Sequence, residues 1–274
     1  MRVSRSAYYS YLKPVLGGAS GQQQTDAEKV RECFYFHRRR YGSRRIAAAL
    51  NIGRFRARSM MRQEGLRAIQ PKSFVPRATD SKHGGRISPN LLKQLACELL
   101  TAGEAVVGDI TYLPLQNGKW CYLATFQDKL TRRIIGWEVA AAMTAELVVK
   151  ALQMALRHGR IGRQAIIHTD RGAQYVSDAY RQLLAAHGLR QSMSGKGNCY
   201  DNAQAESFFS RFKAELVEGG MFEDTAQAKS ETFSYIEGYY NRIRLHSSLG
   251  YLSPMEFEKQ LKIKNQRSSV SFVS

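Results

Sequence analysis

Three acidic residues occupy sequence contexts in which a carboxylate is unusual. Asp109 interrupts the strand-like run 106–112, and Asp170 follows the short, mainly apolar run 165–169. Glu206 comes after thirty-five further residues, in a stretch typical of a helix. A charge within a strand is costly unless a partner or a metal ion compensates it. Hard divalent cations prefer carboxylate and phosphate oxygens, so this pattern predicts a metal site that acts on phosphates.

Phosphoryl transfer on DNA is served by two Mg²⁺ ions about 4 Å apart, one activating the attacking oxygen and the other stabilising the leaving oxygen. The smallest set of acids that can hold both ions is one aspartate shared between them and one further acid for each ion. Each acid alone is more often a solvated surface group, so the prediction rests on the combination. We expect Asp109, Asp170 and Glu206 to be catalytic and to bind two Mg²⁺ (or Mn²⁺) ions.

Polar and basic side chains near the acids are candidates for contact with DNA. Lys213 lies seven residues after Glu206, hence on the same helix face, in a position to hold a phosphate. His168 precedes Asp170 by two residues and either contacts substrate or packs in the core. The segment around residues 239–250 fits DNA contact and core packing equally well. We assign to DNA contact Lys213, His168, Asn202, Arg171, Arg244 and His246.

The chain of 274 residues is strongly basic, with 41 Lys and Arg against 23 Asp and Glu and a net charge of +18. Residues 1–86 hold nineteen of the basic residues and only five of the acidic ones. Such a field attracts polyanions, so we expect the first third of the chain to bind nucleic acid. The remainder is nearly balanced, and a hydrophobic content of 43% is that of a folded protein.

Cysteine usage and hydropathy narrow the class of protein further. The four cysteines show no CxxC spacing and are expected to be reduced thiols rather than disulfides or zinc ligands. No apolar run reaches membrane-spanning length, and the first residues lack the apolar centre of a signal peptide. We therefore expect a cytoplasmic protein that does not associate with membranes.

Short helical patterns separated by glycine-containing turns predict a helix-turn-helix-like region over residues 1–66. A capping-box pattern at 25–28 predicts a helix to about residue 40, followed by helices at 43–49 and 54–64. The alternative is a small helical bundle with a solvated basic face. On the third helix we assign to DNA contact Arg54, Arg58 and Arg62.

The rest of the chain is predicted to be a basic linker with a lead-in helix (67–100), a catalytic core with C-terminal helices (101–262) and a tail (263–274). The order of elements in the core predicts an α/β fold with a mixed five-stranded sheet and flanking helices. Its first and fourth strands should be neighbours, which brings Asp109 to Asp170. The predicted strands are 106–115, 120–127, 132–141, 165–169 and 189–193, and the predicted helices are 144–157, 177–187, 201–217 and 225–241.

Several motifs resemble the catalytic core of bacterial insertion-sequence transposases of the OrfB type. They are residues 108–112 (GDITY), 168–175 (HTDRGAQY) and 194–209 together with Lys213, and residues 240–254 are similar as well. These enzymes belong to the DDE transposase and retroviral-integrase superfamily. The resemblance covers essentially the whole chain, and the thirty-five-residue spacing between the second Asp and the Glu is a specific match.

The resemblance implies an RNase H-like core, with Asp109, Asp170 and Glu206 as the metal-binding triad and Lys213 as the basic residue one heptad later. It also implies hydrolytic nicking at the end of an element, then transesterification by the freed 3′-hydroxyl, without a covalent protein–DNA intermediate. The expected partners are insertion-sequence ends and target DNA, bound by a homo-oligomer at the bacterial nucleoid.

The full transposase of this family is usually a frameshifted fusion to an upstream frame with a helix-turn-helix and a leucine zipper. No heptad run occurs here, so we expect an OrfA-type partner or fusion. Two other functions fit the same residues: a structure-selective nuclease that cuts without joining, and a non-catalytic DNA-binding regulator. A metal-dependent DNA transposase catalytic subunit is the favoured function. The intact set of acids weighs against the regulator, and an assay for joined products separates the transposase from the nuclease.

Overall fold

The structure, a computed structural model, describes residues 21–71, 86–94, 101–195, 203–217 and 220–270. The chain forms two compact units, Met1–Ile69 and Gln70–Ser274. The first twenty residues of the region predicted at 1–66, and most of the expected linker, lie outside the described residues. Within the described ranges, none of the helices combines the length and the apolar character of a membrane span.

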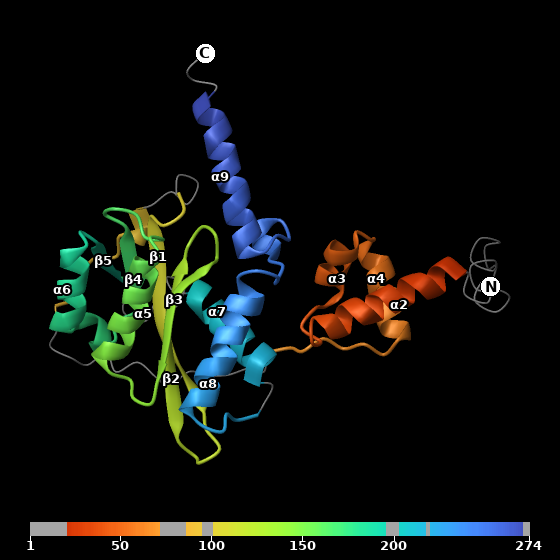
Figure 1. Ribbon diagram of the computed structural model, residues 1–274, viewed down its shortest axis with the longest axis horizontal. Coiled ribbons are helices and arrows are strands. Elements are labelled where there is room, and N and C mark those ends of the chain that lie inside the picture. Colours follow the sequence, from red (N-terminus) through yellow and green to blue (C-terminus); the bar gives the residue numbers. More distant parts are fainter. Residues whose placement is uncertain (1–20, 72–85, 95–100, 196–202, 218–219, 271–274) are drawn as a thin grey trace, which may run out of the picture. The chain divides into compact units, whose positions relative to one another are not determined.

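The first unit contains α2 (Gly21–Phe36), α3 (Ser43–Leu50) and α4 (Arg54–Gln63), drawn in red and orange in Figure 1. Asn51 starts the turn between α3 and α4 in the left-handed conformation, with φ of 51°. The core of this unit contains Tyr41, from the connection between α2 and α3, and buried helical side chains, namely Val30, Phe34, Ile46, Ala57, Met60 and Met61. The predicted helix-turn-helix-like arrangement is therefore present.

α2 begins and ends earlier than predicted. Thr25 lies inside the helix rather than at its start, so the capping-box prediction was wrong. The helix ends before residue 40 because Arg38 and Arg39 adopt positive φ angles of 48° and 61°. The chain then turns so that the ring of His37 stacks on Tyr41, with 3.6 Å between the ring centroids.

The second unit is built on a five-stranded sheet with the strand order β3-β2-β1-β4-β5. β1, β2 and β3 are joined as antiparallel neighbours, whereas β4 pairs in parallel with both β1 and β5. The predicted mixed sheet and the predicted pairing of the first strand with the fourth are both confirmed. The strands are β1 (Ala105–Pro114), β2 (Trp120–Asp128), β3 (Ile134–Ala140), β4 (Ile166–Thr169) and β5 (Arg190–Met193).

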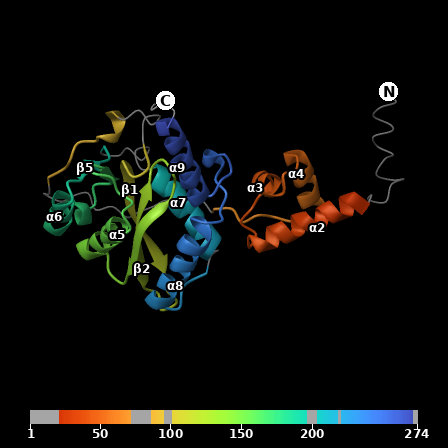
Figure 2. The ribbon, with the colours of Figure 1, turned by 45° about the horizontal axis from the view of Figure 1, so that its top comes forward.

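Helices cover both faces of the sheet, as Figures 1 and 2 show. α5 (Ala145–Arg157) and α6 (Asp178–Ala186) cover one face, where they enclose a core that includes Phe126 and Ile167. α7 (Ala203–Phe212) and α8 (Thr225–Phe233) cover the other, around Leu123 and Trp137. α9 (Pro254–Val270) ends the described chain and continues beyond residue 262, where we placed the end of the core.

Two of the predicted helices change their hydrogen-bonding pattern partway. α7 is followed by a π-helix, Lys213–Val217, and α8 by a second π-helix, Ser234–Tyr240. The lead-in helix expected from residue 89 appears, among the described residues, only as the 3₁₀ turn Leu92–Gln94.

β3 and α5 approach each other so closely that Gly136 has no room for a side chain. A Cβ atom there would lie 2.2 Å from the carbonyl oxygen of Ala151 and 2.8 Å from the Cβ atom of Ala155. We expect Gly136→Ala to lower the free energy of unfolding by about 1–3 kcal/mol, measured by urea denaturation. Gly238→Ala is the matched control, because nothing lies within 4 Å of its added Cβ atom. An unchanged midpoint for Gly136→Ala would contradict this packing.

Candidate active site

Asp109 lies in β1 and Asp170 directly follows β4, the strand that pairs with β1 in parallel. Val107 pairs with His168 at the end of the β1–β4 ladder. Asp109 and Asp170 each follow this pair by two residues, so we expect them to lie near each other just beyond the ladder. Leu113 of β1 packs on the α7 side of the sheet, and alternation along the strand directs Asp109 to the same side. This register supports the prediction that the two aspartates lie close together.

Both carboxylates are half-buried and bonded to nearby backbone amides. The N–H of Ile110 donates to Oδ1 of Asp109 (2.8 Å), and the N–H of Gly172 donates to Oδ1 of Asp170 (3.0 Å). The hydroxyl of Tyr175 is buried and has no hydrogen-bond partner in the described part of the chain. Burial, followed by the charges of Asp170 and Asp109, raises the pKa of Tyr175 well above its ordinary value. The charges of both carboxylates therefore contribute to the pKa shift of the same buried tyrosine.

α7 runs along β1 and carries the third predicted acid. At its start, Nε2 of Gln204 donates to a backbone carbonyl at the end of β2 (3.1 Å). Just past its end, Nζ of Lys213 lies 3.9 Å from the ring centroid of Tyr112 in β1. Burial lowers the pKa of Lys213, and the charge of Asp109 opposes this change. Glu206 lies between these two contacts on the helix and is exposed.

The donor chemistry of the aspartate pair fits hard divalent cations. Asp109 and Asp170 each offer a half-buried carboxylate, and carboxylate oxygens are ligands that Mg²⁺ and Mn²⁺ prefer. Among the residues that the structure describes, no group of three His, Cys, Asp or Glu side chains is close enough to hold a metal ion. Residues 196–202, which precede α7 in the sequence, lie outside the described residues. The convergence of Glu206 with the aspartates therefore stays a prediction.

His168 belongs to the core rather than to a DNA-binding surface. Its ring is fully buried, with Nδ1 2.8 Å from Oγ of Ser192 and Nε2 3.1 Å from Oγ of Ser194. The assignment of His168 to DNA contact was therefore wrong, and the packing alternative holds. Arg171 is half-buried and donates through Nε to the carbonyl of Ser194 (2.8 Å), so its contact with DNA stays a prediction. Asn202 lies outside the described residues.

Arg244, also assigned to DNA contact, is buried in an ion pair with Glu215. Its Nη2 lies 2.7 Å from Oε1 and its Nε 2.9 Å from Oε2, and the side chains are 3% and 2% exposed. The hydroxyl of Tyr235 donates to the same carboxylate (2.8 Å). Burial acts to lower the pKa of Arg244, but the charge and hydrogen bonds of Glu215 raise it above the ordinary value. Because the guanidinium is inaccessible, the DNA-contact prediction for Arg244 was wrong.

His246 is half-buried, and its ring packs edge-on against Tyr240 with 4.9 Å between centroids. Its predicted contact with DNA is not decided by this packing and stays a prediction.

The Glu215–Arg244 pair fixes the backbone that presents Lys213. Glu215 lies in the π-helix Lys213–Val217, and Arg244 follows the π-helix Ser234–Tyr240. The pair thus joins two stretches of chain across the layer that covers the candidate site. Sequence reasoning missed Glu215, because an acid two residues from a lysine resembles a solvated helix surface. Its one signal was its apolar neighbours, Ala214, Leu216 and Val217.

On α4, the three arginines assigned to DNA contact are all exposed. Arg56, which lies between them, pairs instead with Asp26 of α2. The opposite side of the helix is buried through Ala57, Met60 and Met61. Arg54, Arg58 and Arg62 are therefore accessible, as contact with DNA requires, and their role stays a prediction.

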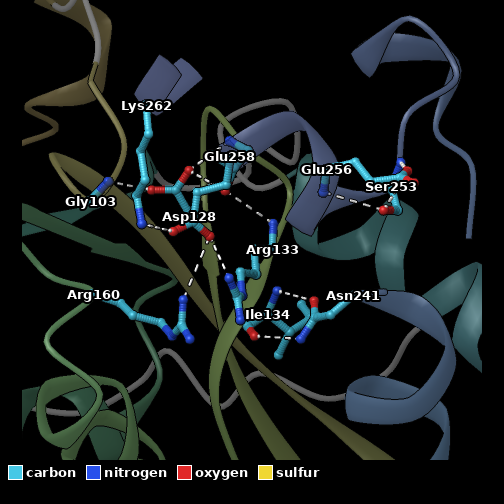
Figure 3. Close-up of polar contacts among 11 residues, drawn as sticks. Gly103, Asp128, Arg133, Ile134, Arg160, Asn241, Ser253, Glu256, Glu258 and Lys262 are labelled. Atoms are coloured by element: carbon cyan, nitrogen blue, oxygen red, sulfur yellow. Dashed lines mark hydrogen bonds and ion pairs between the residues drawn. The ribbon is translucent and has the colours of Figure 1, made fainter. Parts of the chain in front are cut away.

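A polar network at the end of β2 joins the sheet to α9 (Figure 3). Asp128 accepts hydrogen bonds from the N–H groups of Gly103 (2.6 Å) and Thr131 (2.6 Å). Desolvation by burial raises the pKa of Asp128, and these hydrogen bonds oppose the change. Beside it, Glu258 of α9 forms ion pairs with Arg133, Arg160 and Lys262. This network, which the sequence patterns did not indicate, holds the start of β1 against the end of β2.

Removing one partner of the buried Glu215–Arg244 pair should leave the other charge uncompensated. We expect Arg244→Met to lower the free energy of unfolding by about 3–5 kcal/mol, and the double variant Glu215→Leu/Arg244→Met to recover part of this loss. Urea denaturation measures both. Lys150→Met breaks an exposed pair with Glu146 (2.8 Å) and should change stability little. Wild-type stability of Arg244→Met would refute the role given to the pair.

Known proteins match the chain over almost its whole length. The "Integrase core domain" family matches residues 101–199, and a second family with the same description matches residues 206–261. The "HTH-like domain" family matches residues 22–74. The chain is 39% identical over 269 residues to "Transposase InsF for insertion sequence IS3A" of Escherichia coli (strain K12), covering 95% of this chain and 92% of the relative. It is also 39% identical to "Insertion element IS600 uncharacterized 31 kDa protein" of Shigella sonnei, covering 94% and 96%.

A comparison with solved structures finds a likeness to a simian T-cell lymphotropic virus intasome in complex with PP2A regulatory subunit B56 gamma (TM-score 0.48, 15% identity, 84% of this chain and 74% of that one). A second likeness is to the HTLV-2 integrase catalytic core domain in complex with magnesium, in its trimeric form (TM-score 0.45, 13% identity, 58% and 98%). With an InsF relative at 39% identity over nearly the full length of both proteins, the resemblance found in the sequence is confirmed, and the chain belongs to the IS3 family of transposases, of the InsF (OrfB) type with an integrase core domain.

Proposed function

We propose that Asp109, Asp170 and Glu206 form the catalytic set with which this transposase cuts and joins DNA strands at the ends of an insertion sequence. The observation that supports this proposal is the register of β1 and β4, because the half-buried Asp109 and Asp170 each follow the last pair of the ladder by two residues. α7, which carries Glu206, packs along the strand that carries Asp109. Lys213 follows on the same helical path, in a position to hold a DNA phosphate.

The proposed chemistry consists of two phosphoryl transfers. In the first, water cleaves one phosphodiester bond at the element end and leaves a 3′-hydroxyl. In the second, that hydroxyl attacks a phosphodiester bond of the target, and one bond forms for each bond that breaks, so no nucleotide cofactor is needed. Two Mg²⁺ or Mn²⁺ ions held by the three acids would supply the activation of the attacking oxygen and the stabilisation of the leaving oxygen.

The first unit is proposed to be the DNA-binding region, joined by the basic linker at 67–100 to the catalytic core. Arg54, Arg58 and Arg62 are exposed on α4, the second helix of the helix-turn-helix-like arrangement. In such motifs this helix lies in the major groove. The net charge of +18 favours binding through release of counterions from DNA.

We further propose that the enzyme acts in the bacterial cytoplasm, at the nucleoid, as a homo-oligomer that pairs two element ends, together with an OrfA-type partner or fusion. Purified chain with and without the upstream-frame fusion, tested for end cleavage in Mg²⁺, would decide whether the partner is required.

Substituting any of the three acids should remove catalysis and leave DNA binding intact. We expect Asp109→Asn, Asp170→Asn and Glu206→Gln each to abolish strand transfer, because each removes a negatively charged ligand without changing side-chain size. The assay uses labelled element ends with a target plasmid, and a gel shift with the same ends measures binding.

Glu231→Gln, which neutralises an exposed acid on α8, is the matched control and should retain wild-type activity. Full strand transfer by any of the three variants would remove that residue from the set. Cleavage without joining by the wild-type chain would favour the nuclease alternative. DNA binding without either reaction, and without binding of Mg²⁺ or Mn²⁺, would favour a regulator.

Divalent ions should stabilise the folded chain through the aspartate pair. We expect Mg²⁺ or Mn²⁺ to raise the melting temperature of the wild-type chain relative to EDTA, with about 2.7 kcal/mol gained at an ion concentration of 100 times Kd. Asp109→Asn should lose this shift and Glu231→Gln should keep it, as measured by thermal unfolding. An equal shift in Asp109→Asn would mean that the ion binds elsewhere.

A further inference from the structure

A phenylalanine stands on the outer face of α4, among the arginines. Phe55 is the second residue of the helix and is 83% exposed, more than any other large apolar side chain in the described residues. The buried side of α4 contains Ala57, Met60 and Met61, so the helical period directs Phe55 away from the core. The ring therefore contributes nothing to the packing of the first unit.

Arginines flank Phe55 on the exposed surface and decide what kind of partner fits there. Arg54 precedes it, and Arg58 and Arg62 follow by three and seven residues, hence on the same side of the helix. An apolar protein surface laid on Phe55 would have to strip water from these guanidinium groups at high cost. A nucleic acid meets the same groups with phosphates and satisfies their charge.

Within the major groove of DNA, one chemical feature suits an exposed phenylalanine. The 5-methyl group of thymine is apolar, whereas the other groups on the base edges there are hydrogen-bond donors and acceptors. The N-terminal residues of the second helix of a helix-turn-helix are those that reach base edges. Phe55 lies in the first turn of α4, which follows the turn at Asn51 directly.

We propose that Phe55 is a specificity-determining residue that contacts the methyl group of a thymine in the DNA site bound by the first unit. The neighbouring arginines hold phosphates or guanines, and Phe55 selects a T·A pair at one position. This inference rests on the proposed DNA binding by the first unit and is independent of the catalytic acids.

The experiment compares thymine with uracil, which differ only by the methyl group. The full chain first selects its preferred duplex from a random oligonucleotide pool. Each thymine in that duplex is then replaced singly by uracil, and Kd is measured at fixed salt. We expect one replacement to weaken wild-type binding about fourfold, the factor for burying one methyl group. Phe55→Ala should bind the thymine and uracil duplexes equally.

Two control variants separate this contact from other effects. Phe36→Ala removes an aromatic side chain that is 72% exposed on α2 and should retain the wild-type preference for thymine. Arg58→Ala should weaken binding to both duplexes alike and reduce its salt dependence, as expected for a phosphate contact. Circular dichroism and thermal unfolding should show Phe55→Ala folded like the wild type, since the ring is exposed.

Several results would overturn the inference. If every uracil replacement is tolerated by the wild-type chain, or if Phe55→Ala keeps the thymine preference, Phe55 does not read a methyl group. If Phe55→Ala changes the sedimentation of the chain and leaves the thymine preference intact, Phe55 contacts a second copy instead. A chain that discriminates thymine through Phe55 and yet fails to join strands would refute the proposed catalysis while supporting this inference.

Discussion

The proposed catalytic site depends on the parallel pairing of β1 with β4, because the last pair of this ladder lies two residues before each of two aspartates that are far apart in the chain. Parallel strands cannot be joined by a tight turn, so the chain passes through β2, β3 and α5 before it returns as β4. α5 completes this crossover by packing on β3, where Gly136 allows the backbone of the helix to come close. Both aspartates are half-buried, and the charges of both contribute to the raised pKa of the buried Tyr175.

A second set of buried charges keeps the covering layer in place. Glu215 in the first π-helix forms an ion pair with Arg244, which follows the second, and Asn241 bonds both backbone groups of Ile134 in β3 (3.0 Å each). Replacing such a pair with apolar residues is often neutral for stability, whereas its exact geometry specifies one arrangement of the chain. Short π-helical stretches are rare and frequently accompany functional sites. Here the first of them begins at Lys213, beside the strand that carries Asp109.

Much of the sheet was predictable because its strands are β-branched and aromatic runs with clear boundaries, and because Asp109 and Asp170 interrupt or end such runs. The side-chain roles were less predictable. His168 and Arg244 carry groups that bind DNA elsewhere, and only tertiary packing shows that serines or a glutamate surround them. The two π-helices were not predicted, because one extra residue per turn does not change the periodicity of apolar residues clearly enough to be recognised in the sequence. The start of α2 at Gly21 was not predictable from the cap pattern at Thr25, because the four residues before Thr25 continue the helix.

The order of the strands also affects the protein while it is being made. β1, β2 and β3 follow one another through short connections, whereas β4 is reached only after the α5 crossover. Contacts between neighbours in sequence form quickly, and distant ones must first overcome the entropy of loop closure. On the ribosome the chain emerges from its N-terminus. A nascent polypeptide can therefore complete its antiparallel hairpins before β4, the parallel partner of the strand that carries Asp109, has been made. All three predicted catalytic acids are present only after translation has passed Glu206.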